Sequence, residues 1–199
     1  MNEALQNFID ISKATTTAIY DNLDEATLTA AADLIDDCRA LGGRVHITGI
    51  GKTAHVATYA AALLASTGTP SYYLHGTESV HGSCGQLMEN DIVISISNSG
   101  KTPESLAAAR AVRNLGCKLI AVTGNPESPL AQMADLHLFA GVKQEGGPLN
   151  RAPRLSVLAE MIVIQALSIL LQVRRDLTPQ KYITFHPSGA LGQLRSDEK

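Results

Sequence analysis

The first forty residues carry two apolar stripes with the spacing of a helix. The first stripe consists of Leu5, Phe8, Ile9 and Ile11, and the second of Leu28, Ala31, Leu34, Ile35 and Cys38. Side chains three and four positions apart lie on one face of a helix, so the pattern predicts two helices. The glycine pair at 42–43 predicts where the second helix ends.

Beyond residue 43 the pattern changes to short β-branched runs that alternate with helical stretches. The expected strands cover 44–50, 71–74, 91–97, 118–124 and 136–142, and the expected helices cover 52–66, 102–115, 129–134 and 154–175. The strand runs are apolar almost throughout, which is typical of strands buried on both faces. We therefore expect an α/β fold, a three-layer α-β-α sandwich around a five-stranded parallel sheet.

The length of 199 residues indicates a single domain. Within it we expect N-terminal helices at 1–42, an α/β core at 43–150, and a C-terminal helix with a tail at 151–199. Charged residues make up 18% of the chain, against about 25% in an average soluble domain. This low charge predicts that part of the surface is covered in an oligomer.

Composition excludes several other functions. Aromatic residues are 4% of the chain, Trp is absent and the net charge is −3, so nothing favours general binding to nucleic acid or anionic membranes. The three cysteines, Cys38, Cys84 and Cys117, form no CxxC, which argues against a disulfide framework or a zinc ribbon.

The most apolar window of the chain is 155–173, and it contains Glu160 and Gln165. Its uncharged run at 161–171 is too short to span a bilayer and suits a buried helix. The N-terminus has no apolar signal core. We expect a soluble, cytoplasmic protein.

Ligands of parallel α/β sheets bind beyond the carboxyl ends of the strands, so the segments after the strands are the candidates for chemistry. The third expected strand is followed by Ser97, Asn98, Ser99, Gly100, Lys101 and Thr102. Hydroxyls and free backbone N–H groups at a helix start form an anion cradle. The alternative is a simple helix cap by Ser99 or Thr102 before Pro103, but capping uses only one hydroxyl. The segment predicts phosphate binding.

The first expected strand is followed by Gly49, Ile50, Gly51, Lys52 and Thr53. The glycines allow close approach of a ligand to the backbone. The spacing does not fit a P-loop, and Ala54 breaks the dinucleotide fingerprint. Lys52 opposes the helix dipole, which indicates a functional role; the alternative is a solvated lysine.

Four residues of metal-ligating types lie three positions apart between the second and third strands: His75, Glu78, His81 and Cys84. A zinc site is one interpretation, although three interspersed glycines make a continuous helix doubtful. A general acid–base role for His81 is the stronger interpretation, because the segment is polar. A Cys84 nucleophile is weaker, because nothing adjacent would lower its pKa.

Two ionisable residues follow later elements, Glu145 after the fifth strand and His186 after the long helix. Glu145 is either a surface carboxylate or part of the site. His186 is either a turn residue fixed by Pro187 and Gly189 or a catalytic base.

Seven segments, taken in order, resemble the sugar isomerase (SIS) domain family: GIGKTAHVA, ASTGTP, HGSCGQL, ISISNSGKTPES, IAVTGNPESPLA, EGGPLNRAP and HPSGALGQL. They are most similar to arabinose-5-phosphate isomerases, over roughly residues 2–194. The resemblance implies a flavodoxin-like fold and a cofactor-free enzyme that interconverts D-ribulose 5-phosphate and D-arabinose 5-phosphate through an enediolate. It also implies a homotetramer with shared active sites, here without the pair of CBS domains that often follows.

The resemblance assigns roles residue by residue. The matching catalytic positions are Lys52, His81, Glu104, Glu145 and His186, with either Glu104 or His186 as the base. The matching substrate and phosphate positions are Gly51, Gly68, Thr69, Ser97, Asn98, Ser99 and Thr102. His75 matches a position where a metal has been associated with the family, although catalysis is not thought to require it.

The chain departs from the family pattern at several positions near the expected pocket. Lys101 stands where an acidic residue is usual, Ser83 replaces an Asp, and Ser188 replaces a Gly. The stretch 152–158, APRLSVL, replaces a run of small polar residues. These changes keep two alternatives open: a phosphosugar-binding module without activity, and an isomerase for another ketose phosphate such as a hexulose or heptulose phosphate.

Overall fold

The computed structural model describes residues 1–198 of the chain. Its centre is a five-stranded parallel sheet in the order β2-β1-β3-β4-β5. The strands are β1 (Val45–Gly49), β2 (Ser71–Tyr73), β3 (Ile92–Ile96), β4 (Lys118–Thr123) and β5 (Leu136–Phe139). The predicted three-layer α/β fold is confirmed.

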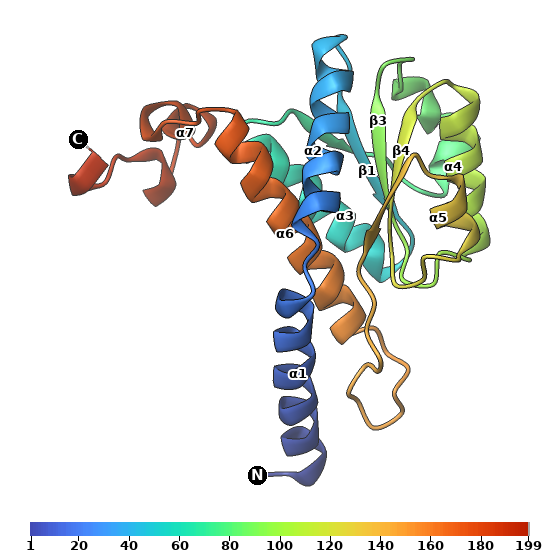
Figure 1. The fold of residues 1–199 in the computed structure, drawn as a ribbon. Helices are drawn as coiled ribbons and strands as arrows, with labels where there is room; N and C mark the ends of the chain where they lie inside the picture. The colour runs from blue at the N-terminus through green and yellow to red at the C-terminus, as the bar shows by residue number, and fades with distance from the viewer. Residues whose placement is uncertain (199) are drawn as a thin grey trace.

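Helices cover both faces of the sheet (Figure 1). One face packs against α2 (Glu25–Ala40), α3 (Lys52–Ser66) and α6 (Leu155–Arg174). The other face packs against α4 (Pro103–Asn114), α5 (Pro129–Met133) and the 3-10 turns Glu78–His81 and Ser83–Gln86. Alternation along β3 explains both cores, since Ile92, Ile94 and Ile96 face the α6 side and Val93 faces the α4 side.

The first helix, α1 (Glu3–Asp21), projects away from this body and packs on α6 (Figure 1). Asn2 caps it by accepting the N–H groups of Ala4 and Leu5. The predicted apolar stripe is present, but no residue of α1 is buried. The stripe therefore lacks the full packing partner that normally stabilises an amphipathic helix.

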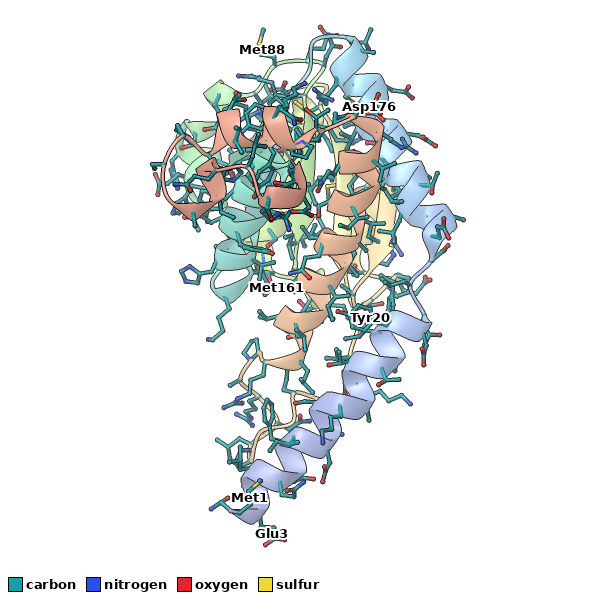
Figure 2. All side chains as sticks on the ribbon, turned by 90° about the vertical axis from the view of Figure 1, so that its left-hand side faces the viewer. Met1, Glu3, Tyr20, Met88, Met161 and Asp176 are labelled. Carbon is teal, nitrogen blue, oxygen red and sulfur yellow. The ribbon has the colours of Figure 1, made fainter. Side chains whose placement is uncertain are left out.

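The long helix α6 is apolar and long enough to cross a membrane by length and composition, but half of that apolar window is buried within this fold. It packs against α1, α2 and α3 as a core helix. Figure 2 shows Met161 near its beginning and Asp176 just beyond its other end. A short helix that the sequence pattern did not predict, α7 (Pro179–Phe185), follows at that far end (Figure 1).

Candidate functional site

All five strands run in one direction, so their carboxyl ends meet at one edge of the sheet, the lower edge in Figure 1. The segments after β1, β3, β4 and β5 emerge there, and α6 also begins there. The sequence analysis predicted the site at this edge.

The segment after β3 has the features of an anion cradle. Thr102 is the N-cap of α4, but its side chain makes no capping hydrogen bond, so the first N–H groups of α4 lack a side-chain acceptor. The Ser97 and Thr102 hydroxyl oxygens lie 3.5 Å apart at the same helix start. The Ser99 hydroxyl accepts the N–H of Lys101 at 3.2 Å, which turns the loop around that end of the helix. A phosphate group placed here would meet hydroxyls and the positive end of the helix dipole together.

The cradle is held against the neighbouring segments by backbone bonds. Gly124 donates its N–H to the Asn98 carbonyl at 2.9 Å, and Leu130 donates to the Gly100 carbonyl at 3.2 Å. Gly100 has a positive φ of 61°, and a Cβ there would lie 2.1 Å from the Ser128 hydroxyl oxygen. Only glycine fits this position without a shift of its neighbours.

The turn after β1 is built on the two glycines singled out in the sequence. A Cβ at Gly49 would lie 2.6 Å from the Thr53 carbonyl oxygen, and Gly51 has a positive φ of 65° as the N-cap of α3. The Thr53 hydroxyl closes the turn by accepting the N–H of Ile50 at 3.0 Å. Lys52 lies exposed on the first turn of α3, at the same edge of the sheet as the cradle.

The His75–His81 segment begins beside the β1 turn. A Cβ at Gly76 would lie 2.4 Å from Ile50 Cδ1. The segment then packs against α4 as a 3-10 turn that leaves His81 exposed. His75 Nδ1 accepts the backbone N–H of Glu78 at 3.3 Å, and within residues 1–198 no group of three His, Cys, Asp or Glu side chains is arranged to hold a metal. These side chains therefore do not assemble a zinc site within one chain, and a metal at His75 stays a prediction.

Cys84 lies in the turn that follows and is half-buried. Burial raises the pKa of its thiol. A raised pKa favours the thiol over the thiolate, which makes Cys84 a poor nucleophile.

Glu145 closes a loop at the start of α6. Its carboxylate oxygen Oε2 accepts the N–H groups of Arg154 at 2.6 Å and Ser156 at 3.2 Å, and its own N–H donates to Asn150 Oδ1 at 2.6 Å. Burial favours a higher pKa for Glu145, but hydrogen bonding from Ser156 and Arg154 at the positive end of α6 holds its pKa below the usual value. Glu145 is thus an ionised carboxylate that caps α6, and its hydrogen-bond partners are backbone groups rather than a histidine.

Three predicted site residues do not join this edge within the chain. Thr69 is fully buried, its hydroxyl accepts from Arg175 Nε at 3.4 Å, and a Cβ at Gly68 would lie 3.5 Å from the Arg175 side chain. Both residues precede β2, so they lie at the amino-end edge of the sheet, beside the C-terminal end of α6.

His186 is the third of these residues. It follows α7 at the far end of α6, whose twenty residues span about 30 Å. Its Nδ1 lies 3.0 Å from the Tyr182 carbonyl oxygen, and its ring stacks on Tyr182 with centroids 4.1 Å apart. Within one chain, His186 is therefore separated from Lys52, Glu104 and Glu145.

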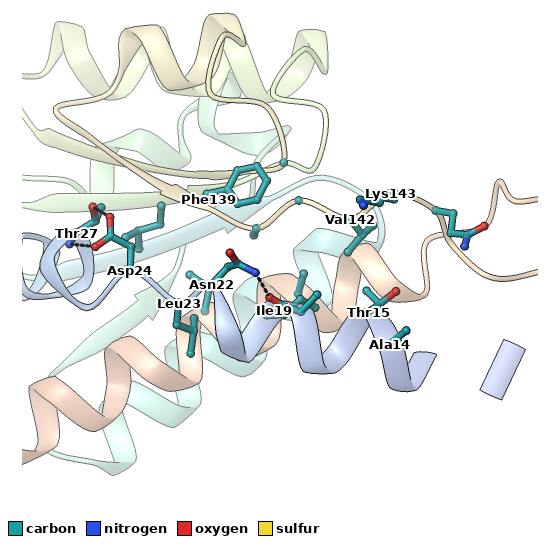
Figure 3. Close-up of a pocket in the computed structure, with 18 of the residues that line it drawn as sticks. Ala14, Thr15, Ile19, Asn22, Leu23, Asp24, Thr27, Phe139, Val142 and Lys143 are labelled. Atoms are coloured by element: carbon teal, nitrogen blue, oxygen red, sulfur yellow. Dashed lines mark hydrogen bonds between the residues drawn. The ribbon is translucent and has the colours of Figure 1, made fainter. Parts of the chain in front are cut away.

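A groove of about 1000 Å³ lies elsewhere, between α1 and the edge strand β5. Ile19 lines it from α1 and Leu23 from the turn after α1, while Phe139 and Val142 line it from the other side (Figure 3). It contains none of the residues assigned to catalysis, and its mainly apolar lining suits packing rather than a phosphate.

Sequence reasoning missed Asn150 and Glu160. Asn150 adopts a positive φ of 48°, rare for a non-glycine residue, while it binds the Glu145 N–H. Glu160 was visible as the acidic residue in the most apolar window, but no local pattern could place it near Glu145.

The fold and the strand-end cradle together define an α/β domain suited to a phosphorylated ligand. The SIS domain family matches residues 42–170. Among relatives, the arabinose 5-phosphate isomerase KdsD of Pseudomonas aeruginosa is 40% identical over 190 residues, covering 94% of this chain and 58% of that protein. KdsD of Escherichia coli K12 is 41% identical over 151 residues, covering 76% of this chain and 46% of that protein.

A solved structure matches nearly the whole of this chain. The structure of Escherichia coli CFT073 c3406 in complex with arabinose 5-phosphate aligns with a TM-score of 0.81 and 34% identity, covering 94% of this chain and all of that one. The chain belongs to the SIS domain family. It spans about half the length of the curated relatives it matches.

Proposed function

We propose that this chain is a phosphosugar ketose–aldose isomerase that interconverts D-ribulose 5-phosphate and D-arabinose 5-phosphate. The observation that carries the proposal is the cradle of Ser97, Ser99 and Thr102 at the start of α4, whose first N–H groups have no side-chain cap. The names of the KdsD relatives and of the arabinose 5-phosphate complex support the choice of substrate.

The reaction moves one proton between C1 and C2 of the open-chain sugar. A base removes the proton from the carbon next to the carbonyl, the electron pair forms an enediolate, and the proton returns to the other carbon. In this proposal the phosphate is bound remotely in the cradle, which positions the two carbons for the base. No step requires a cofactor.

Each polar side chain at the strand ends has a proposed role. Lys52 stabilises the enediolate charge, and His81 opens the sugar ring or moves protons between its oxygens. Glu104, exposed on the first turn of α4, is one candidate for the base, and His186 is the other. Glu145 acts through the α6 start that it caps, in place of the histidine-orienting role suggested by sequence.

We also propose a cytoplasmic homotetramer of this single domain in which a neighbouring subunit supplies His186. Three features support this assembly: the low charge, α1 without a buried residue, and the separation of His186 from the other side chains. Exposed Tyr20, Tyr59 and Ile169 provide apolar surface for subunit contacts.

The decisive experiment is a panel of phosphosugars incubated with the protein in deuterated water and followed by NMR. We expect exchange of the C2 proton and formation of D-ribulose 5-phosphate from D-arabinose 5-phosphate. Turnover of a hexulose or heptulose phosphate instead would show that the chain is an isomerase with a different substrate. Saturable binding without exchange for every sugar would make the chain a binding module. The Lys52→Ala variant provides the catalytic control.

A further inference from the structure

Glu160 is a fully buried carboxyl in the first half of α6. Its exposed fraction is 0%, and neither carboxyl oxygen has a hydrogen-bond partner among the described residues. The Ser156 side chain, one helical turn earlier on the same face, is likewise buried. An isolated carboxylate at such a position is strongly disfavoured, so Glu160 is expected to stay neutral.

A second carboxyl lies close to this position. The N–H of Ser156 donates to Glu145 Oε2 at 3.2 Å, and the N–H of Arg154 donates to the same oxygen at 2.6 Å. Residues four apart on a helix lie one above the other, so the Glu145 carboxylate sits about one turn from Glu160. The two groups differ in environment, because Glu145 faces helix N–H donors and Glu160 has none.

Other elements packed on α6 contribute little charge at Glu160. Among the buried residues of α2 and α3, Cys38 alone can titrate; the rest are Leu28, Ala31, Ala32, Ile35, Val56, Ala57, Ala60, Ala61 and Leu64. The charged residues of α1, namely Glu3, Asp10, Lys13 and Asp21, are exposed to solvent. Glu145 is the ionised group that acts on Glu160.

We propose that Glu160 is a positioning residue that must stay protonated for ionised Glu145 to hold the 145–154 loop closed at the start of α6. If Glu160 ionised, a buried carboxylate would lie about one turn from the half-buried Glu145 carboxylate, and their repulsion would displace Glu145 from the α6 backbone. The loop follows β5 at the edge that carries the cradle. The link to catalysis rests on the proposed isomerase function, whereas the loop closure does not.

Protonation states at the two carboxyls agree with this arrangement. Burial, with a further contribution from Glu145, raises the pKa of Glu160 to about 8. Hydrogen bonding outweighs burial at Glu145 and keeps its pKa low. The closed arrangement therefore holds at neutral pH and is lost in the mildly alkaline range.

The first test compares pH profiles of the wild type and Glu160→Gln, which keeps the size of the side chain and cannot ionise. We expect wild-type kcat/KM to fall about tenfold between pH 7 and pH 9, and that of Glu160→Gln to change by less than about twofold. Ser168→Ala, which removes another buried hydroxyl farther along α6, is the matched control and is expected to keep the wild-type profile. If kcat/KM of Glu160→Gln fell at alkaline pH as in the wild type, the proposal would be overturned. A merely structural role for Glu160 predicts that the variant and the wild type share the same pH profile.

The second test needs no enzyme activity. Backbone amide signals of Arg154 and Ser156, which donate to Glu145, are followed by NMR across the same pH range. We expect both to shift with a midpoint near pH 8 in the wild type and to stay flat in Glu160→Gln. If the amides titrate but no phosphosugar is isomerised, the proposed function fails and the positioning role stands. Flat amide signals in the wild type would overturn the positioning role whatever the activity, even if the variant did not fold.

Discussion

At the scale of single residues, the hydroxyl groups of the α4 cradle carry the phosphate-binding hypothesis. Ser99 both turns the loop and presents its oxygen at the helix start. We expect Ser99→Ala to weaken binding of inorganic phosphate and of every phosphosugar alike, because a hydrogen bond to a charged group contributes about 1.5–3 kcal/mol, or roughly ten- to hundredfold in affinity. Calorimetry measures both dissociation constants, with Ser66→Ala at the other end of α3 as the control. Unchanged constants in Ser99→Ala would remove the loop from the site.

Glu160 gives a second prediction at this scale, concerning global stability. Its pKa rises from a usual 4.5 to about 8 on folding, so the folded state holds a proton that the unfolded state releases. The resulting contribution to stability is complete below the unfolded pKa and is lost as pH rises through the folded one. We expect the free energy of unfolding of the wild type to fall relative to Glu160→Gln by up to about 1.4 kcal/mol per pH unit in that window. Urea titrations at several pH values measure the difference, and parallel curves for the two proteins would contradict it.

At the scale of elements, the geometry of the cradle depends on one glycine. A Cβ at Gly100 would meet the Ser128 side chain, and its backbone lies in the left-handed region. Gly100→Ala is therefore expected to lower stability by on the order of 1–3 kcal/mol and to weaken phosphate binding. Gly85→Ala is the matched control, because nothing lies within 4 Å of its Cβ position and its φ is not positive. Thermal unfolding and phosphate titration compare the two, and equal effects from both variants would rule out the steric argument.

Elements and strand-end loops were predictable from sequence because their signals are local. The alternation of strand and helix patterns predicted the five-stranded parallel sheet. Ser97, Ser99 and Thr102 lie within six residues, between the end of a strand and the start of a helix. The structure moves expected boundaries inward at several strand ends, as at β5, which ends at Phe139 rather than at 142.

Contacts between distant segments were not predictable in this way. The proximity of Glu160 to Glu145 depends on how the loop returns to α6, and periodicity does not contain that information. Gly68 and Thr69 come directly before β2, so they lie at the amino-end edge of the sheet and not at the carboxyl-end edge. The unburied stripe of α1 reflects a surface that one chain alone does not cover.

At the scale of the whole molecule, the residues of the proposed site lie in two separate places within one chain. Lys52 and Glu104 lie at the carboxyl edge of the sheet, and His186 follows α7 at the far end of α6. In the proposed assembly the His186 of one subunit reaches the strand ends of its neighbour, and a two-fold axis would make this exchange reciprocal. On this basis we expect His186→Ala to keep phosphate binding and to lower kcat by roughly 10²–10⁴, the range for loss of a general acid–base group.

Complementation separates a shared site from one within a single chain. His186→Ala and Lys52→Ala subunits are each expected to be inactive, but a hybrid pair contains one site with both residues intact and one site with neither. Random exchange of equal amounts makes half of the pairs hybrid, so activity should recover to roughly a quarter of the wild-type value. Mixing His186→Ala with the double variant Lys52→Ala/His186→Ala is the control and must stay inactive, because no site then regains His186. Native mass spectrometry verifies that subunits have exchanged. If they have exchanged and the first mixture is still inactive, His186 acts within its own chain, and the tail must then fold back along the length of α6 to reach Lys52.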